Sequence, residues 1–227
     1  MMRTAVTIAT LASIAGLASG QVVYTDTVGD TFTTAGDGIL DIVQVEVSNT
    51  LDDITFVITV DGDVDATDWG KYLVIIDSAP GGDTAGNGWG RPIGMSQGAN
   101  NWLGSWVDGG NGLEAYSWDG GAWQLDGSTN DATPGLSITK GGNTVTLTAP
   151  LALLGIVVGQ DIEFDVFTSG GGEGDGAVDS LGNPGQQIGD WGDFSEAFPL
   201  VYTVVPAPGV FALGLLGGVA VATRRRR

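Results

Sequence analysis

Apolar and polar residues alternate with a period of two along most of this chain. Between Ile54 and Val60 every second residue is large and apolar, and Thr55 and Thr59 are among the residues in between. The same alternation, rich in Val, Ile, Thr and Phe, recurs in the segments 41–49, 143–150 and 161–169. A period of two with these residue types is typical of β-strands that bury one face.

Other segments complete the predicted sheets. The segment 71–77, KYLVIID, is apolar at nearly every position, which predicts a central strand buried on both faces. The segment 199–205, PLVYTVV, predicts a last strand that closes a sheet. Glycine-rich turns in 117–125 and 136–148 each separate two strand-like runs, which predicts two β-hairpins. The segment 149–159 predicts no more than a single helical turn.

These elements predict an all-β fold. Because no segment resembles the crossover helices that parallel strands need, we expect an antiparallel β-sandwich of about eight to ten strands. Its layering would be of the jelly-roll or immunoglobulin-like kind. The 39 glycines have no fixed period, and the segment 170–179, GGGEGDGAVD, is interpreted as a flexible loop.

The N-terminal segment has the pattern of a secretory signal peptide. Arg3 provides an early positive charge, and an apolar run from Ala5 to Leu17 follows it. Ala18 and Gly20 are the small residues that precede a cleavage site before Gln21. The pattern predicts an N-terminal signal helix, export through the general secretion route, and removal of the signal peptide.

Composition excludes several classes of function. The chain has 27 acidic and 8 basic residues, and only Lys71, Arg91 and Lys140 among the basic ones lie between the two end segments. The domain between them has a net charge of −24, which repels nucleic acids and attracts divalent cations. Cysteine and histidine are absent, so disulfides, Ser-His-Asp triads and Cys-His dyads are excluded, and zinc is not an expected ligand.

The C-terminal segment combines three features that occur together in sorting signals. A proline motif comes first and consists of Val205, Pro206, Ala207, Pro208 and Gly209. The apolar run 210–222 that follows is shorter than the roughly 20 residues that a membrane-spanning helix needs. The chain then ends in a cationic cluster, which consists of Arg224, Arg225, Arg226 and Arg227. Such a cluster stays on the cytoplasmic side of a membrane.

This order resembles the PEP-CTERM sorting signals of bacteria, although Ala207 stands where the namesake motif has Glu. The resemblance implies processing by an exosortase-type enzyme and sorting to the cell surface or extracellular matrix. The alternative is a C-terminal hydrophobic helix that stays in the membrane as a permanent anchor. The chain accordingly divides into a signal peptide (1–20), a β-sandwich domain (21–203) and a sorting tail (204–227).

The central domain resembles a group of carbohydrate-binding sandwiches. After an Asp-rich start, three strand-like segments follow one another; Asp77 ends the third, and Asp83 lies in the Gly-rich loop beyond it. This order resembles the DOMON-like and family-nine-type carbohydrate-binding modules over most of residues 22–203. The resemblance implies a sandwich fold and is compatible with binding of extracellular polysaccharide.

Two groups of aspartates are candidate calcium ligands. Calcium prefers about six to eight hard oxygen ligands, and carboxylates that alternate along a loop can converge on one ion. One group lies in a predicted loop and contains Asp61, Asp63, Asp65 and Asp68. The other lies near the start of the domain and contains Asp26, Asp30, Asp37 and Asp41. The alternative for both groups is a set of solvated acidic loops.

Five of the 7 tryptophans are candidate sugar-binding residues, and they are Trp89, Trp102, Trp106, Trp118 and Trp123. The apolar face of a sugar ring stacks on flat aromatic rings, while nearby Asn, Asp and Gln side chains bind its hydroxyls. The segment between these tryptophans is rich in Gly and Asn. For Trp118 and Trp123, which flank a hairpin turn, the alternative is that they cover one end of the sandwich core.

The sequence therefore predicts a non-catalytic, exported protein of the cell surface or extracellular matrix that associates with polysaccharide, with calcium as a further ligand. Two alternatives stay open. One is a purely structural matrix protein without a specific ligand. The other is a carbohydrate-active enzyme, because a glycosidase needs only two carboxylates. No pair of carboxylates stands out in the sequence.

Overall fold

The computed structural model describes residues 20–183 and 188–206. In these ranges the chain consists of strands joined by turns and loops, and its one helical element is the short 3-10 turn Thr129–Asp131. The strands of the two large sheets pair in antiparallel fashion. The prediction of an all-β, antiparallel fold is confirmed.

The predicted signal helix and C-terminal hydrophobic helix lie outside the described residues. Within the two described ranges, no helix is long and apolar enough to cross a membrane. Gly20 and Val205, close to the two ends of the described part, lie side by side. The Tyr202 hydroxyl donates a hydrogen bond to the Gly20 carbonyl oxygen at 2.6 Å.

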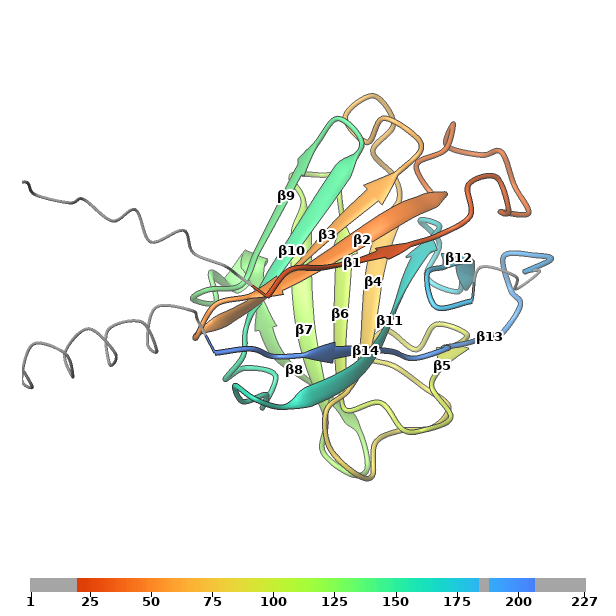
Figure 1. Cartoon of the computed structure of the whole chain (residues 1–227). Helices are drawn as coiled ribbons and strands as arrows, with labels where there is room; N and C mark the ends of the chain where they lie inside the picture. Colours follow the sequence, from red (N-terminus) through yellow and green to blue (C-terminus); the bar gives the residue numbers. More distant parts are fainter. Residues whose placement is uncertain (1–19, 184–187, 207–227) are drawn as a thin grey trace, which may run out of the picture.

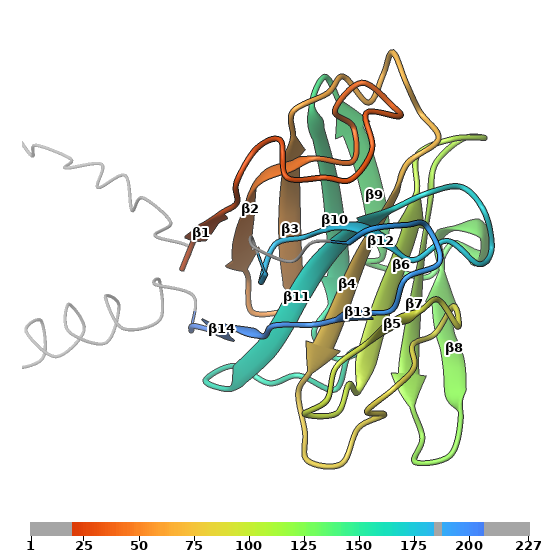
Figure 2. The same cartoon turned by 90° about the vertical axis from the view of Figure 1, so that its right-hand side faces the viewer.

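Two large sheets lie one over the other (Figures 1 and 2). The five-stranded sheet has the order β1 (Val22–Thr25), β2 (Ile42–Asn49), β3 (Asp53–Val60), β10 (Thr144–Pro150) and β9 (Ser137–Gly141). The seven-stranded sheet has the order β12 (Ala177–Ser180), β11 (Asp161–Ser169), β4 (Lys71–Asp77), β6 (Asn101–Trp106), β7 (Gly112–Trp118) and β8 (Trp123–Ser128), and β14 (Leu200–Thr203) also pairs with β11. The short strands β5 (Ile93–Gly94) and β13 (Ser195–Glu196) pair in parallel.

The segments predicted from alternation form strands with few changes. Both predicted hairpins are present, as β7–β8 and β9–β10, and β4 lies inside the seven-stranded sheet with six of its seven residues buried. The segment 151–155 forms turns, as expected. The described residues contain fourteen strands, more than predicted, because strands of two to four residues such as β5 and β12 are too short to show alternation.

The main hydrophobic core lies between the two large sheets. Alternate residues of β3 point into it, so Phe56 and Ile58 are fully buried, as the period of two predicts. From the facing sheet, Phe164 of β11 packs against Phe56 and Tyr24, with ring centroids 5.6 and 5.2 Å apart. Val43 departs from the predicted alternation because a bulge at the start of β2 leaves it half-buried and buries Ile42 instead.

A second apolar cluster covers the other face of the seven-stranded sheet. Leu73 and Ile75 of β4 contribute to this outer cluster, together with Trp102 of β6. The segments 78–100 and 188–199 lie over them and include β5 and β13 (Figure 2). Two-sided burial explains why β4 is a continuous apolar run, since each of its faces meets a different cluster.

One part of the glycine-rich segment 170–179 differs from the prediction of a flexible loop. Its last residues belong to β12, whose four residues are all buried and which pairs with β11. Asp179 is in this strand and is only 5% exposed. The strand is too short and too close to glycines for its alternation to be recognised.

Asp165 of β11 is a buried carboxylate that accepts four hydrogen bonds. Its Oδ1 accepts from the backbone N–H groups of Val166 and Gly182 at 2.7 and 2.8 Å. Its Oδ2 accepts from the Ser180 hydroxyl and the Phe198 N–H, each at 3.0 Å. Burial raises the pKa of Asp165 to about 7, whereas the four donors favour its ionised form. The carboxylate thus ties β11 to the covering segment at Phe198.

We expect Asp165→Asn to lower the free energy of unfolding by about 3 kcal/mol or more, as measured by denaturant titration. The amide nitrogen would face donors and leave them unpaired, and each buried unpaired donor costs about 1–3 kcal/mol. Asp126→Asn, at an exposed position of β8, is the matched control and should change stability by about 0.5 kcal/mol or less. Equal effects at the two positions would contradict the structural role of Asp165.

Candidate functional site

The outer face of β6, β7 and β8 displays aromatic side chains beside the outer cluster. Leu103 of β6 and Leu113 of β7 point into the core between the sheets. Alternation along the strands therefore directs Trp106 and Tyr116 to the opposite, outer face. Trp89 reaches the same face from the segment 78–100.

Trp102 is not part of an exposed surface. Its side chain is fully buried in the outer cluster, under the segments that cover the sheet. Trp89 packs against it, with ring centroids 6.4 Å apart. The prediction that Trp102 binds a sugar is therefore corrected: it is a core residue, which clustering in sequence could not distinguish from its partly exposed neighbours.

Two of the tryptophan rings pack closely against glycine residues. The ring of Trp89 lies against Gly104 and that of Trp106 against Gly112, so closely that a Cβ atom at either glycine would overlap the ring. Trp89 Nε1 donates to Glu114 Oε2 at 2.8 Å. The two rings are neighbours, with centroids 6.4 Å apart. Backbone and carboxylate together hold Trp89 in one orientation.

Trp118 and Trp123 form a cross-strand pair next to the β7–β8 turn. They are directly opposite in the register, and their ring centroids are 5.8 Å apart. Trp123 Nε1 donates to Asp83 Oδ2 at 2.8 Å, so this ring is also fixed by a carboxylate. We call the four partly exposed residues Trp89, Trp106, Trp118 and Trp123 the tryptophan face.

A pocket of about 350 Å³ opens beside Trp89 and is also lined by Arg91, Tyr116 and Glu173. Arg91 is 5% exposed, and its guanidinium lies 5.3 Å from the centroid of the Trp89 ring. Burial lowers the pKa of Arg91, and the charge of Asp175 partly opposes that shift. The pKa of Tyr116 is raised to about 12. Burial is the main cause, and the hydrogen bond that the Tyr116 hydroxyl donates to Glu114 is the next.

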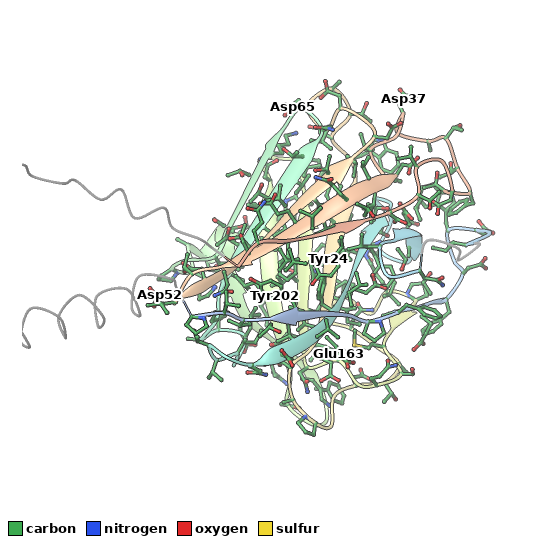
Figure 3. All side chains as sticks on the ribbon, viewed as in Figure 1. Tyr24, Asp37, Asp52, Asp65, Glu163 and Tyr202 are labelled. Atoms are coloured by element: carbon green, nitrogen blue, oxygen red, sulfur yellow. The ribbon has the colours of Figure 1, made fainter. Side chains whose placement is uncertain are left out.

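The first predicted calcium group does not converge. Asp63 Oδ1 accepts from the N–H groups of residues 65 and 66 within its own turn, and Asp65 Oδ2 accepts from the Gly142 N–H at 2.8 Å. Asp68 lies 3.7 Å from Lys140 Nζ. These three carboxylates and that of Asp61 are exposed, and Asp65 is at the rim of the molecule (Figure 3). This group therefore fits the alternative interpretation, a solvated acidic loop, better than a calcium site.

Two members of the second group, Asp30 and Asp41, converge with an aspartate from a distant part of the chain. Carboxylate oxygens of Asp30, Asp41 and Asp179 lie within 4.8 Å of one another. Asp26 is close enough to raise the pKa of Asp179 through its charge, as Asp30 does. We call these four residues the aspartate quartet. Asp37 is exposed, points away at the edge of the molecule, and is not a member (Figure 3).

Burial leaves several oxygens of the quartet without hydrogen-bond donors. Asp26 Oδ2, Asp30 Oδ1 and Asp41 Oδ1 are buried and have no partner. Burial is the main cause that raises the pKa of Asp26 to about 7 and of Asp179 to about 8, and like charges add to it. The pKa values of Asp30 and Asp41 are raised too, mainly by burial. Carboxylates in this state favour a proton or a metal ion as a partner.

Asp179 is the site residue that the sequence analysis missed. It is more than a hundred residues away from the other three, and only the pairing of β12 with β11 brings it to them. The one local signal is an acidic residue in the short, mostly apolar segment AVDSL (177–181). Such a residue in a strand is buried only if something offsets its charge.

Comparison with known protein families, with curated proteins and with solved structures finds no match to this chain.

We expect Trp102→Ala to lower the free energy of unfolding by about 3–5 kcal/mol, because it removes a large side chain from a closed cluster. Trp118→Ala removes a partly exposed ring and should cost much less. Thermal or denaturant unfolding of both variants measures the difference. If Trp118→Ala proved as costly as Trp102→Ala, the distinction between a core residue and a surface residue would fail.

Proposed function

We propose that this chain is an exported, non-catalytic protein of the cell surface or extracellular matrix that binds polysaccharide through the tryptophan face. In this proposal its two sheets form a sandwich of the carbohydrate-binding type. The observation that supports it is the gathering of four partly exposed tryptophans on one face, where two of them are oriented by carboxylates.

Pre-ordered rings favour sugar binding for a thermodynamic reason. A free tryptophan side chain loses rotamer freedom when it stacks on a ligand, and that loss weakens binding. Trp89 packs on Gly104 and is hydrogen-bonded to Glu114, and Trp123 is hydrogen-bonded to Asp83. Much of the loss of rotamer freedom has therefore already occurred on folding. The remaining lone pairs of the two carboxylates can accept hydrogen bonds from sugar hydroxyls.

Charge indicates which polysaccharides suit the face. Glu114 and Asp83 lie among the tryptophans, Glu173 lines the neighbouring pocket, and the domain as a whole has a net charge of −24. Polyanionic glycans would be repelled. A neutral polysaccharide rich in hydroxyl groups is therefore the proposed ligand class.

The resemblance of the two ends to export and sorting signals supports the proposed location. Gly20, at the predicted signal cleavage site, lies beside Val205 of the proline motif. Val205 is held to the domain by a hydrogen bond from its N–H to Asn49 Oδ1 at 3.0 Å, and Pro206 is exposed. The remaining residues of the motif, Ala207, Pro208 and Gly209, and the arginines Arg224–Arg227 lie outside the described residues.

Replacing both Trp89 and Trp106 by Ala should abolish retention on an immobilised neutral polysaccharide. Loss of each stacking ring should weaken binding by about 1–3 kcal/mol, by analogy with stacking of bases on aromatic side chains. Affinity electrophoresis in gels with and without polysaccharide measures the effect. Circular dichroism checks that the variant is folded.

The matched control is Trp191→Ala, which removes a partly buried tryptophan that packs against Phe32 and Trp69 outside the tryptophan face. This variant should be retained like the unmodified chain. Polysaccharide binding through the tryptophan face would be disproved if the folded double variant kept full retention.

The mature protein in its native cell should lack residues 1–20 and the segment Val210–Arg227. Intact-mass analysis of protein recovered from the cell surface or matrix tests this directly. Deleting Arg224–Arg227 should misplace the precursor, because no cationic cluster would then stop transfer of the short apolar run. Recovery of a chain that still ends in Arg227 would favour the permanent anchor instead.

A further inference from the structure

The aspartate quartet brings together two distant parts of the chain. Asp26, Asp30 and Asp41 belong to the connection between β1 and β2 of the five-stranded sheet. Asp179 belongs to β12, at the edge of the seven-stranded sheet. The quartet is thus located where the two sheets meet along one side of the molecule, away from the tryptophan face.

The charge of the quartet has no counterpart among the described residues. Asp41 is 7% exposed; its Oδ2 accepts from the Gly29 N–H, but its Oδ1 is buried without a partner. Asp26 Oδ2 and Asp30 Oδ1 are also buried and unpartnered. A proton would neutralise one carboxylate only, whereas a divalent cation offsets the charge of several carboxylates at once.

The three basic side chains of the domain are engaged elsewhere. Lys71 pairs with Asp108 at 3.2 Å, and Lys140 pairs with Asp68 at 3.7 Å. Arg91 Nη1 donates to the Ser169 hydroxyl and to the Asp175 carbonyl. Acidic oxygens that converge in a buried space without donors or basic partners need a cation to offset their charge.

We propose that the aspartate quartet binds one calcium ion. Carboxylate oxygens of Asp30, Asp41 and Asp179, which lie within 4.8 Å of one another, supply three of its ligands. Asp26 lies beside them and adds negative charge that favours the ion. Water or main-chain carbonyls complete the coordination. The proposal is independent of polysaccharide binding, because no member of the tryptophan face contributes a ligand.

The ligand chemistry distinguishes calcium from other divalent ions. All four side chains offer hard oxygen, and the chain has neither the cysteine nor the histidine that zinc and copper favour. Magnesium requires near-ideal octahedral geometry and keeps several waters, so it rarely occupies a cage built from many carboxylates. Calcium accepts irregular sets of about six to eight oxygens and loses water more readily.

The ion would fasten the β1–β2 connection to the seven-stranded sheet. Hydrogen bonds already cross at this point: the Ile42 N–H donates to Asp179 Oδ2 at 2.6 Å, and the Thr168 hydroxyl donates to the Leu40 carbonyl at 2.5 Å. Without the ion, repulsion within the quartet opposes these contacts. With it, Asp30 and Asp41 of the β1–β2 connection and Asp179 of β12 share one ion, which holds the two sheets together along this side.

The test compares thermal unfolding of the full chain, solubilised in mild detergent, in chelator, in calcium and in magnesium. Calcium at about a hundred times its Kd should raise the melting temperature by on the order of 5–10 °C, and magnesium at the same concentration should not. Tryptophan emission offers a second readout, since Phe32 of the β1–β2 connection packs edge-on against Trp191 at 5.3 Å.

Asp30→Asn is the informative variant, because no hydrogen bond to its carboxylate from another residue would be lost. It removes one ligand and one like charge. In chelator it should melt at or above the unmodified chain, and in calcium it should melt below it. Asp37→Asn makes the same charge change in the same connection outside the quartet and should respond to calcium like the unmodified chain.

Three results would overturn the proposal. One is an identical melting temperature in chelator and in excess calcium. Another is a calcium response that Asp30→Asn leaves intact. The third is an equal loss of response in Asp30→Asn and Asp37→Asn, which would mean that calcium acts on the general negative charge. Asp30→Asn relieves repulsion, so it should stay folded in chelator. Its melting temperature in chelator therefore shows whether a lost calcium response comes from misfolding instead of from the lost ligand.

Discussion

The arrangement of this domain follows from one constraint: the seven-stranded sheet has large apolar side chains on both faces. The five-stranded sheet covers its inner face around Phe56 and Phe164. Its outer face, with Ile75 and Trp102, is covered by the segments 78–100 and 188–199, which have little regular structure of their own. Removing such apolar surface from water is favourable whether a sheet or an irregular segment covers it. These segments leave part of the outer face uncovered over β6, β7 and β8, where Trp106, Trp118 and Trp123 lie, and Trp89 of the covering segment completes the tryptophan face.

Two buried acidic sites show two ways in which this strongly acidic domain holds carboxylates inside. Asp165 is surrounded by four donors, so the protein itself stabilises its charge and uses it to attach the outer covering. The aspartate quartet has buried oxygens without donors, and its members repel one another. A site of the first kind is complete in the protein alone. A site of the second kind favours a proton or a metal ion as a partner that offsets its charge.

The period of two was sufficient to predict the strands that line the main core, because each of them has one buried and one open face. The double burial of β4 was also visible, as a continuous apolar run. Alternation could not separate Trp102 from Trp106, since both lie on the outer face and only the covering segments decide which is buried. Asp26, Asp30 and Asp41 were grouped by proximity in sequence, whereas Asp179 reaches them only through the pairing of β12 with β11, which no local pattern encodes.

Anomalous scattering from crystals of the protein grown with calcium tests most directly whether a cation joins the two sheets. We predict one strong calcium peak per chain, at about 2.3–2.6 Å from oxygens of Asp30, Asp41 and Asp179. Ordered quartet side chains with no peak between them would contradict the calcium site. So would a peak only at the exposed loop that contains Asp61, Asp63, Asp65 and Asp68.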